Sequence, residues 1–136
     1  MEMPTTIQCI QLAGLVQLSI ALASLAIPRE LGWREETKRL QPLTREVFWT
    51  YAAYIWGTNV ALGLVSLLLA PDLASGSPLA RAITGYALLY WGARLAIQLV
   101  CFGKHAPEGL RFKMAEAALT VAFAVLTATY AWACFG

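Results

Sequence analysis

Arg94 is the residue of this sequence whose type and position are hardest to explain by packing alone. It lies inside a long apolar stretch, about nine residues from the end, which in a helix is a depth of roughly 13 Å. An arginine buried in a bilayer costs about 2.5–3.5 kcal/mol on insertion scales. A guanidinium binds carboxylates, phosphates and carbonyl oxygens. We therefore expect Arg94 to face neighbouring helices and to hold such an acceptor.

Polar residues of the other apolar stretches fall close to the depth of Arg94. On its own helix Tyr90 precedes it by four residues and Gln98 follows it by four, so these side chains share one face. Glu116 is the carboxylate placed deeply enough to balance the arginine charge. The predicted buried polar cluster, or ligand site, consists of Arg94, Gln98, Glu116, Asn59, Tyr54, Tyr90, Gln17 and Thr120.

Three interpretations of this cluster stay open. In the first, an Arg94–Glu116 pair and amide hydrogen bonds only hold helices in register. In the second, Arg94 binds the anionic or carbonyl head of a lipid-like or quinone-like ligand. In the third, it pairs with an acidic residue of another membrane subunit or of a second copy. The sequence thus predicts a small non-catalytic membrane protein, either an accessory subunit of a complex or a binder of such a ligand.

Other chemistry is sparse. His105 is the single histidine, and we find no CxxC, HExxH, phosphate-binding loop or Ser-His-Asp set, so no catalytic residue, metal ligand or cofactor is identified. The net charge is +2 without a long basic run, which argues against nucleic acid as a partner. The first apolar stretch lacks the carboxylate of small proton-coupled transporters, so transport ranks third. Cys9 and Cys134 lie near one predicted face, either as a disulfide or as two separate thiols.

Four apolar stretches must position these residues. The chain is 59% hydrophobic and 13% charged, whereas soluble domains carry about 25% charged residues. Each stretch reaches the roughly 20 residues that a membrane-spanning helix needs. We predict an all-α, polytopic membrane protein: one domain over residues 1–136, folded as a four-transmembrane-helix bundle with spans near 7–27, 47–70, 79–102 and 114–135. Thr44 is expected to cap the second helix, and Ser77 the third, with proline following at position 78.

The distribution of positive charge predicts the orientation. Residues 28–46 hold five of the ten Lys and Arg residues and residues 103–113 hold three more, and both segments fall on one side of a four-span chain. The positive-inside rule makes that side cytoplasmic and places both termini on the non-cytoplasmic side of a plasma or inner membrane, among membrane lipids. Residues 28–46 form either a short helix in the headgroup layer or a solvated connector. Tyr130, Trp132 and Phe135 are expected to be interfacial anchors.

The N-terminal stretch is expected to be retained as an anchor. Met1-Glu2-Met3-Pro4 is acidic rather than basic, and Pro28-Arg29-Glu30 is not a small-residue cleavage site.

One family resemblance offers an enzymatic alternative. Gly92-Ala93-Arg94 late in the third span, followed by Pro107 and Arg111, is similar to the arginine pair of the membrane-associated eicosanoid and glutathione metabolism family. The outline of four helices with both termini outside is similar as well. The resemblance implies that Arg94 and Arg111 hold an anionic thiol cofactor. Thr44-Arg45-Glu46-Val47 stands where that family has its Asn-x-x-Glu signature.

Overall fold

The structure, a computed structural model, describes residues 3–102 and 109–136. The described residues form helices and no strand, which confirms the all-α class. In chain order the elements are α1 (Met3–Ser24), α2 (Ile27–Glu30), α3 (Trp33–Thr37), α4 (Pro42–Leu68), α5 (Ala70–Ala74), α6 (Pro78–Ile97), the π-helix η1 (Gln98–Phe102) and α8 (Leu110–Phe135).

Three helical segments of the described chain are long and apolar enough to cross a membrane. They are Pro4–Glu30, Pro42–Leu68 and Leu110–Phe135. The α6 helix is not one of them, because Arg81 and Arg94 lower the mean hydropathy of its 20 residues. The apolar residues that would extend it, such as Leu99 and Val100, belong to η1. Three of the four predicted spans therefore meet this criterion.

The observed helix ends correct several predicted boundaries. The α4 helix begins at Pro42, with Gln41 as its N-cap, so Thr44 lies inside the helix and does not cap it. The α8 helix begins at Leu110, before the predicted span 114–135, as expected for a helix that opens near Pro107 ahead of its apolar part; residues 103–108 lie outside the described part. Ser77 does cap α6: its Oγ accepts the backbone N–H of Ala80 at 3.1 Å, as predicted.

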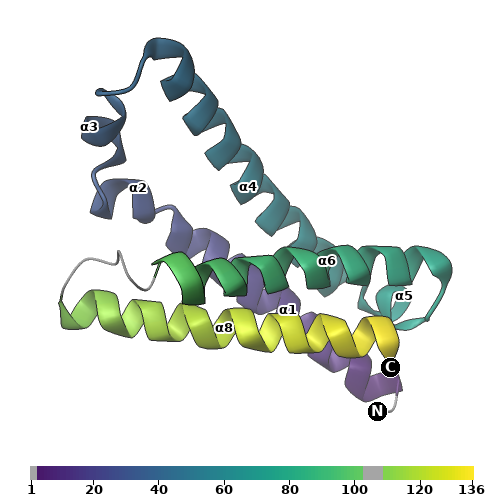
Figure 1. Ribbon diagram of the computed structural model, residues 1–136. Coiled ribbons are helices and arrows are strands. Elements are labelled where there is room, and N and C mark those ends of the chain that lie inside the picture. Colours follow the sequence, from purple (N-terminus) through teal and green to yellow (C-terminus); the bar gives the residue numbers. More distant parts are fainter. Residues whose placement is uncertain (1–2, 103–108) are drawn as a thin grey trace.

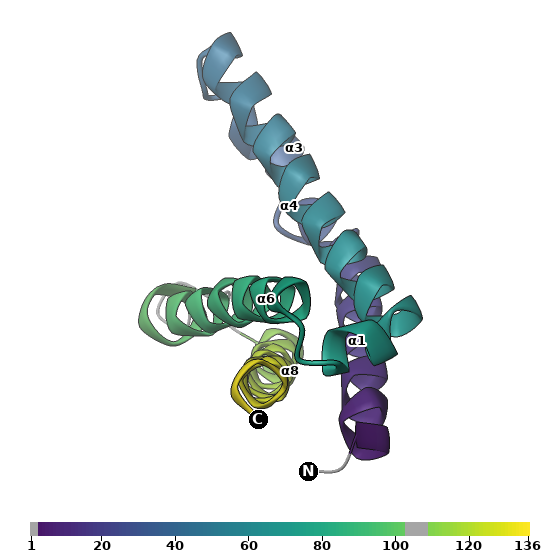
Figure 2. The same cartoon turned by 90° about the vertical axis from the view of Figure 1, so that its right-hand side faces the viewer.

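The long helices are arranged as two pairs (Figure 1). The α6 and α8 helices lie side by side along their length, and α1 packs on α4. Where α1 and α4 cross, Gly14 meets Gly63: a Cβ atom on Gly14 would lie 2.7 Å from the carbonyl oxygen of Gly63. Glycine is required here because the two backbones touch. From this crossing α4 runs away from the α6–α8 pair, as Figure 2 shows from the side.

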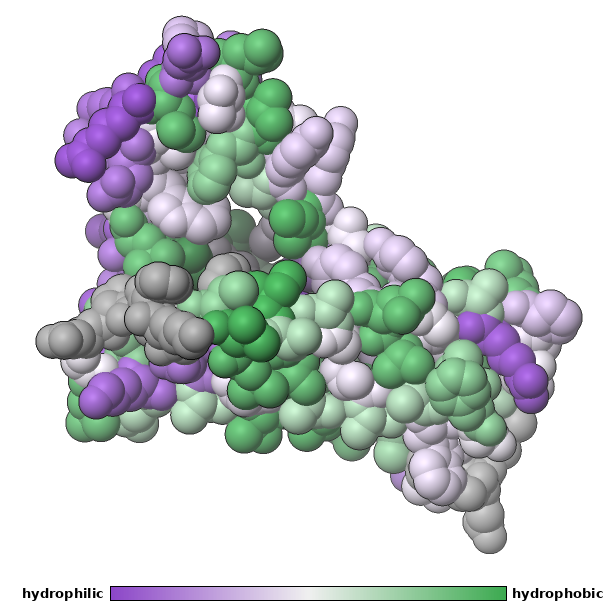
Figure 3. Space-filling view, in the orientation of Figure 1, coloured by the Kyte–Doolittle hydropathy of each residue, from purple (hydrophilic) through white to green (hydrophobic). Residues whose placement is uncertain are grey.

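The two ends of the molecule differ. The loop end comprises α2, α3 and the start of α8, whereas α5 and both termini lie at the opposite, terminal end (Figure 1). At the loop end, Nη2 of Arg111 lies 2.8 Å from Oε2 of Glu30, so the two basic segments meet. Trp33 of α3 packs edge-to-face on Phe48 of α4, with ring centroids 5.0 Å apart. Figure 3 shows strongly polar residues gathered at the ends and apolar residues between them.

Candidate functional site

A buried network of hydrogen bonds connects four helices. The indole N–H of Trp91 on α6 donates to Oε1 of Gln17 on α1 at 3.0 Å. The amide nitrogen of Gln17 donates to the carbonyl of Ala13 and to the hydroxyl of Tyr130 on α8. The Tyr130 hydroxyl also bonds to the hydroxyl of Ser66 on α4. We call Gln17, Ser66, Trp91 and Tyr130 the polar node; each is at most 1% exposed.

The node was only partly predicted. The sequence places Gln17 in the buried cluster, but it indicates an interfacial anchor at Tyr130, which lies near the end of its helix. The structure corrects this: Tyr130 is 0% exposed and faces the bundle. The signal that identifies it is spacing, since Phe123, Leu126 and Tyr130 recur every three or four residues and form one buried stripe.

A second interhelical bond lies next to the node, since Tyr90 directly precedes Trp91. The Tyr90 hydroxyl on α6 donates to Oδ1 of Asn59 on α4. Asn59 is 8% exposed, so its amide group is held almost entirely inside the protein. The N-terminal half of α4 continues from this point away from α6, and the surface is hollowed there (Figure 3). We call this region the α4–α6 opening. Of the predicted cluster, Tyr90 and Asn59 are brought into direct contact.

Arg94 lies one helical turn after Tyr90, beside the α4–α6 opening. Its guanidinium carbon sits 4.9 Å from the centroid of the Phe123 ring, a cation–π contact. Phe123 in turn stacks on Trp91 at 5.5 Å, with the ring planes 26° apart. The Arg94 side chain is half-buried, and its Nη1 atom is fully enclosed. The arginine therefore rests on the aromatic core of the α6–α8 pair, as predicted for an inward-facing residue.

The backbone changes its winding at Gln98, one helical turn after Arg94. Gln98, another predicted residue, is 5% exposed and begins η1. Its N–H points to the carbonyls of both Arg94 and Leu95. A π-helical turn is rare and occurs frequently at functional sites. The sequence contained no signal for it, since the run Gln98–Phe102 has ordinary helix-compatible residues.

The other predicted residues lie elsewhere on the helices. Glu116 and Thr120 are half-buried on α8, where the Thr120 hydroxyl donates to the carbonyl of Glu116 at 2.8 Å. Tyr54 is 70% exposed on α4 and does not join the cluster, because five helical residues turn it about 140° away from Asn59. The ion pairs of the described residues are Lys38–Glu35, Arg39–Glu36 and Arg111–Glu30, so the predicted Arg94–Glu116 pair is not among them.

The cysteines and potential metal ligands form no site in the described residues. Cys9, Cys101 and Cys134 form no disulfide with one another, so the disulfide alternative for Cys9 and Cys134 is not realised. No group of three His, Cys, Asp or Glu side chains gathers within residues 3–102 and 109–136. His105 lies outside the described residues. The site is therefore defined by a cation, amides, hydroxyls and aromatic rings.

Comparisons with known proteins add no relative: no protein-family model, no curated protein and no solved structure matches this chain.

Proposed function

We propose that this protein is a non-catalytic integral membrane protein of four spans, in which Arg94 binds the anionic or carbonyl head of a lipid-like ligand at the α4–α6 opening. The observation that carries the proposal is the position of Arg94. It is a half-buried cation within the helical bundle, resting on Phe123 at 4.9 Å, beside the place where α4 turns away from α6.

The fourth span would be α6 together with η1. They run from Pro78 to Phe102, which corresponds to roughly 37 Å of helix and exceeds the hydrocarbon thickness of about 30 Å. The α6 helix lies along α8, which is itself apolar enough to span. The contact of Arg111 with Glu30 supports a common side for the two basic segments. The positive-inside rule makes that side cytoplasmic in a plasma or inner membrane.

The groups beside the opening favour a ligand whose head accepts hydrogen bonds. Arg94 offers five N–H donors and no acceptor. The Asn59 oxygen accepts from Tyr90, and the amide nitrogen of Asn59 adds two further N–H donors. A carboxylate, a phosphate or a quinone carbonyl matches this excess of donors. The lipid-like tail follows from the apolar surface of α4 and α6 around the opening, which includes Ile55 and Ile97.

Native mass spectrometry of the protein released from membranes in a mild detergent tests the proposal. The wild type and an Arg81→Gln control are expected to retain an amphiphile bearing an acidic or carbonyl head. Arg81 is an exposed arginine on the same helix, outside the opening. An Arg94→Gln variant that folds should retain at least about tenfold less of the amphiphile than the wild type. A tenfold loss of affinity corresponds to about 1.4 kcal/mol of binding free energy.

Three results would contradict the proposal. Equal retention in both variants would leave Arg94 a structural residue. A stoichiometric membrane protein that leaves with Arg94→Gln would make the chain an accessory subunit instead. Thiol-dependent conversion of an electrophilic lipid, lost in Arg94→Gln and Arg111→Gln, would favour the enzymatic alternative.

A further inference from the structure

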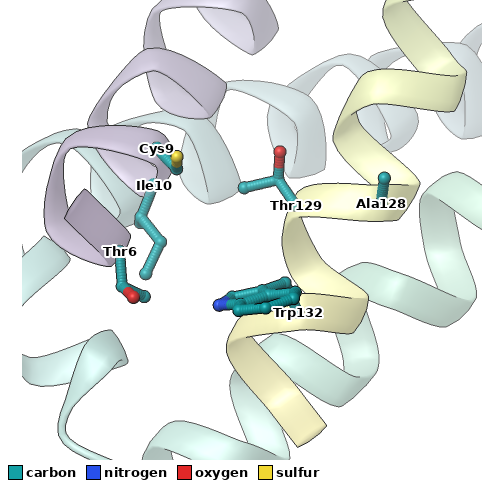
Figure 4. A pocket seen from close by; sticks show the side chains of 6 residues that line it. All are labelled: Thr6, Cys9, Ile10, Ala128, Thr129 and Trp132. Atoms are coloured by element: carbon teal, nitrogen blue, oxygen red, sulfur yellow. The ribbon is translucent and has the colours of Figure 1, made fainter. Parts of the chain in front are cut away.

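A pocket remote from Arg94 opens at the terminal end, between the first turns of α1 and the last turns of α8 (Figure 4). Its volume is about 200 Å³, and the residues around it are Thr6, Cys9, Ile10, Ala128, Thr129 and Trp132. Both helices are long and apolar enough to cross a membrane, so in a spanning arrangement the pocket lies between two lipid-exposed helices.

The walls of the pocket are mostly apolar. Ile10 is 0% exposed and closes it on the α1 side. The Thr129 hydroxyl donates to the carbonyl of Val125 at 2.8 Å, and its methyl group points into the pocket (Figure 4). An apolar cavity of about 150 Å³ stays dry and binds benzene. Hydrocarbon, rather than water, therefore suits a pocket of this size and lining.

A hydrogen-bond donor stands at the outer rim. Trp132 lies three residues before the end of α8, roughly 5 Å along the helix axis. Its indole nitrogen is directed across the pocket toward Thr6 (Figure 4). Tryptophan at this level of a spanning helix lies in the membrane interface, with its ring in the apolar layer and its N–H among polar lipid groups. The pocket thus combines a hydrogen-bond donor at its rim, the Trp132 N–H, with mostly apolar walls.

We infer that this pocket binds one acyl chain of an ester-linked membrane lipid. The ester carbonyl accepts the N–H of Trp132, and the chain packs on Ala128 and the methyl group of Thr129. The bound chain fills the space between α1 and α8, which belong to different helix pairs. This site is independent of the Arg94 ligand, so either can fail alone.

Photolabelling of the full chain in phosphatidylcholine vesicles tests the inference. A small fraction of the lipid carries a diazirine on one acyl chain, and labelled peptides are mapped by mass spectrometry. Labelling within residues 6–10 and 128–132 should exceed that of Leu12 and Val121 about tenfold, which corresponds to 1.4 kcal/mol of preference. These two residues are 61% and 63% exposed on the same helices and report ordinary lipid contact.

Variants with a larger side chain separate the pocket from general lipid exposure. Ala128→Phe fills the pocket and should remove the excess labelling, whereas Ala118→Phe, at an exposed position of α8, should keep it. Uniform labelling, or the same pattern in both variants, would overturn the inference. Should Ala128→Phe fail to fold, the wild type decides: pocket labelling saturates with probe fraction if the site is specific, and rises in parallel with Leu12 labelling if it is not.

Discussion

The indole N–H of Trp91 and the amide oxygen of Gln17 are 3.0 Å apart, and this bond ties α6 to α1 in the interior of the molecule. The amide nitrogen of Gln17 donates to the hydroxyl of Tyr130 on α8, and that hydroxyl also bonds to Ser66 of α4. One glutamine thus links both helix pairs. Such a network substitutes for the apolar driving force that is missing between helices in lipid.

Replacing the central amide should weaken the association of all four helices. In Gln17→Leu the Trp91 N–H and the Tyr130 hydroxyl each lose a partner while remaining buried, which costs about 1–3 kcal/mol. The free energy of unfolding, measured by denaturant titration in detergent micelles, checks this. Gln8→Leu, at an exposed position of the same helix, is the control and should leave stability unchanged. Equal values for the two variants would show that the node contributes nothing measurable.

The crossing of α1 and α4 depends on the absence of a side chain at position 14. In Gly14→Ala the new Cβ would lie 2.7 Å from the Gly63 oxygen and 2.8 Å from the Leu67 nitrogen, so the helices must separate. We expect a loss of about 1–3 kcal/mol, as for overpacked cores. Gly57→Ala meets no atom within 4 Å and should be neutral or stabilising. Thermal midpoints in one detergent compare the two, and a neutral Gly14→Ala would contradict the close approach.

The two cation–π contacts should differ in strength. Arg94 lies 4.9 Å from Phe123, which is 2% exposed, and Arg111 lies 5.0 Å from Phe112, which is only half-buried. Desolvation raises the stabilisation from a cation–π contact from about 0.5–1 kcal/mol to about 2 kcal/mol. Phe123→Leu should therefore destabilise more than Phe112→Leu, and it also loses the stack on Trp91. Unfolding free energies that rank the variants in reverse would place Arg94 outside the aromatic core.

Labelling of single cysteines tests whether α6 spans. In one variant Cys9 and Cys134 are replaced by serine, which leaves Cys101 after α6. In a second variant Cys101 is replaced as well, and Ser75→Cys provides the single thiol before α6. A membrane-impermeant maleimide should reach the Ser75→Cys thiol in intact cells and Cys101 only after permeabilisation. Reaction of both thiols from one side would show that α6 does not cross the membrane.

The long helices could be predicted from the sequence because apolar length is a local property. The Ser77–Pro78 start of α6 was equally local, and its cap is present. Long-range features were harder. The sequence does not distinguish the buried Tyr130 from the exposed Tyr54, because neither depth nor distance from a helix end shows which way a side chain faces. The departure of α4 from α6 depends on packing among several helices, which no single stretch encodes.

At the crossing of α1 and α4, Gly14 and Gly63 let the two backbones touch. Because glycine has no side chain, neither residue inserts atoms into the facing helix, and a change of the crossing angle would break no side-chain contact of these two residues. The polar node keeps the ends of the helices near Ser66 and Tyr130 together, so a change of angle displaces the Pro42 end of α4 most. Trp33 of α3 packs on Phe48 near that end of α4, so α3 would have to follow any such displacement.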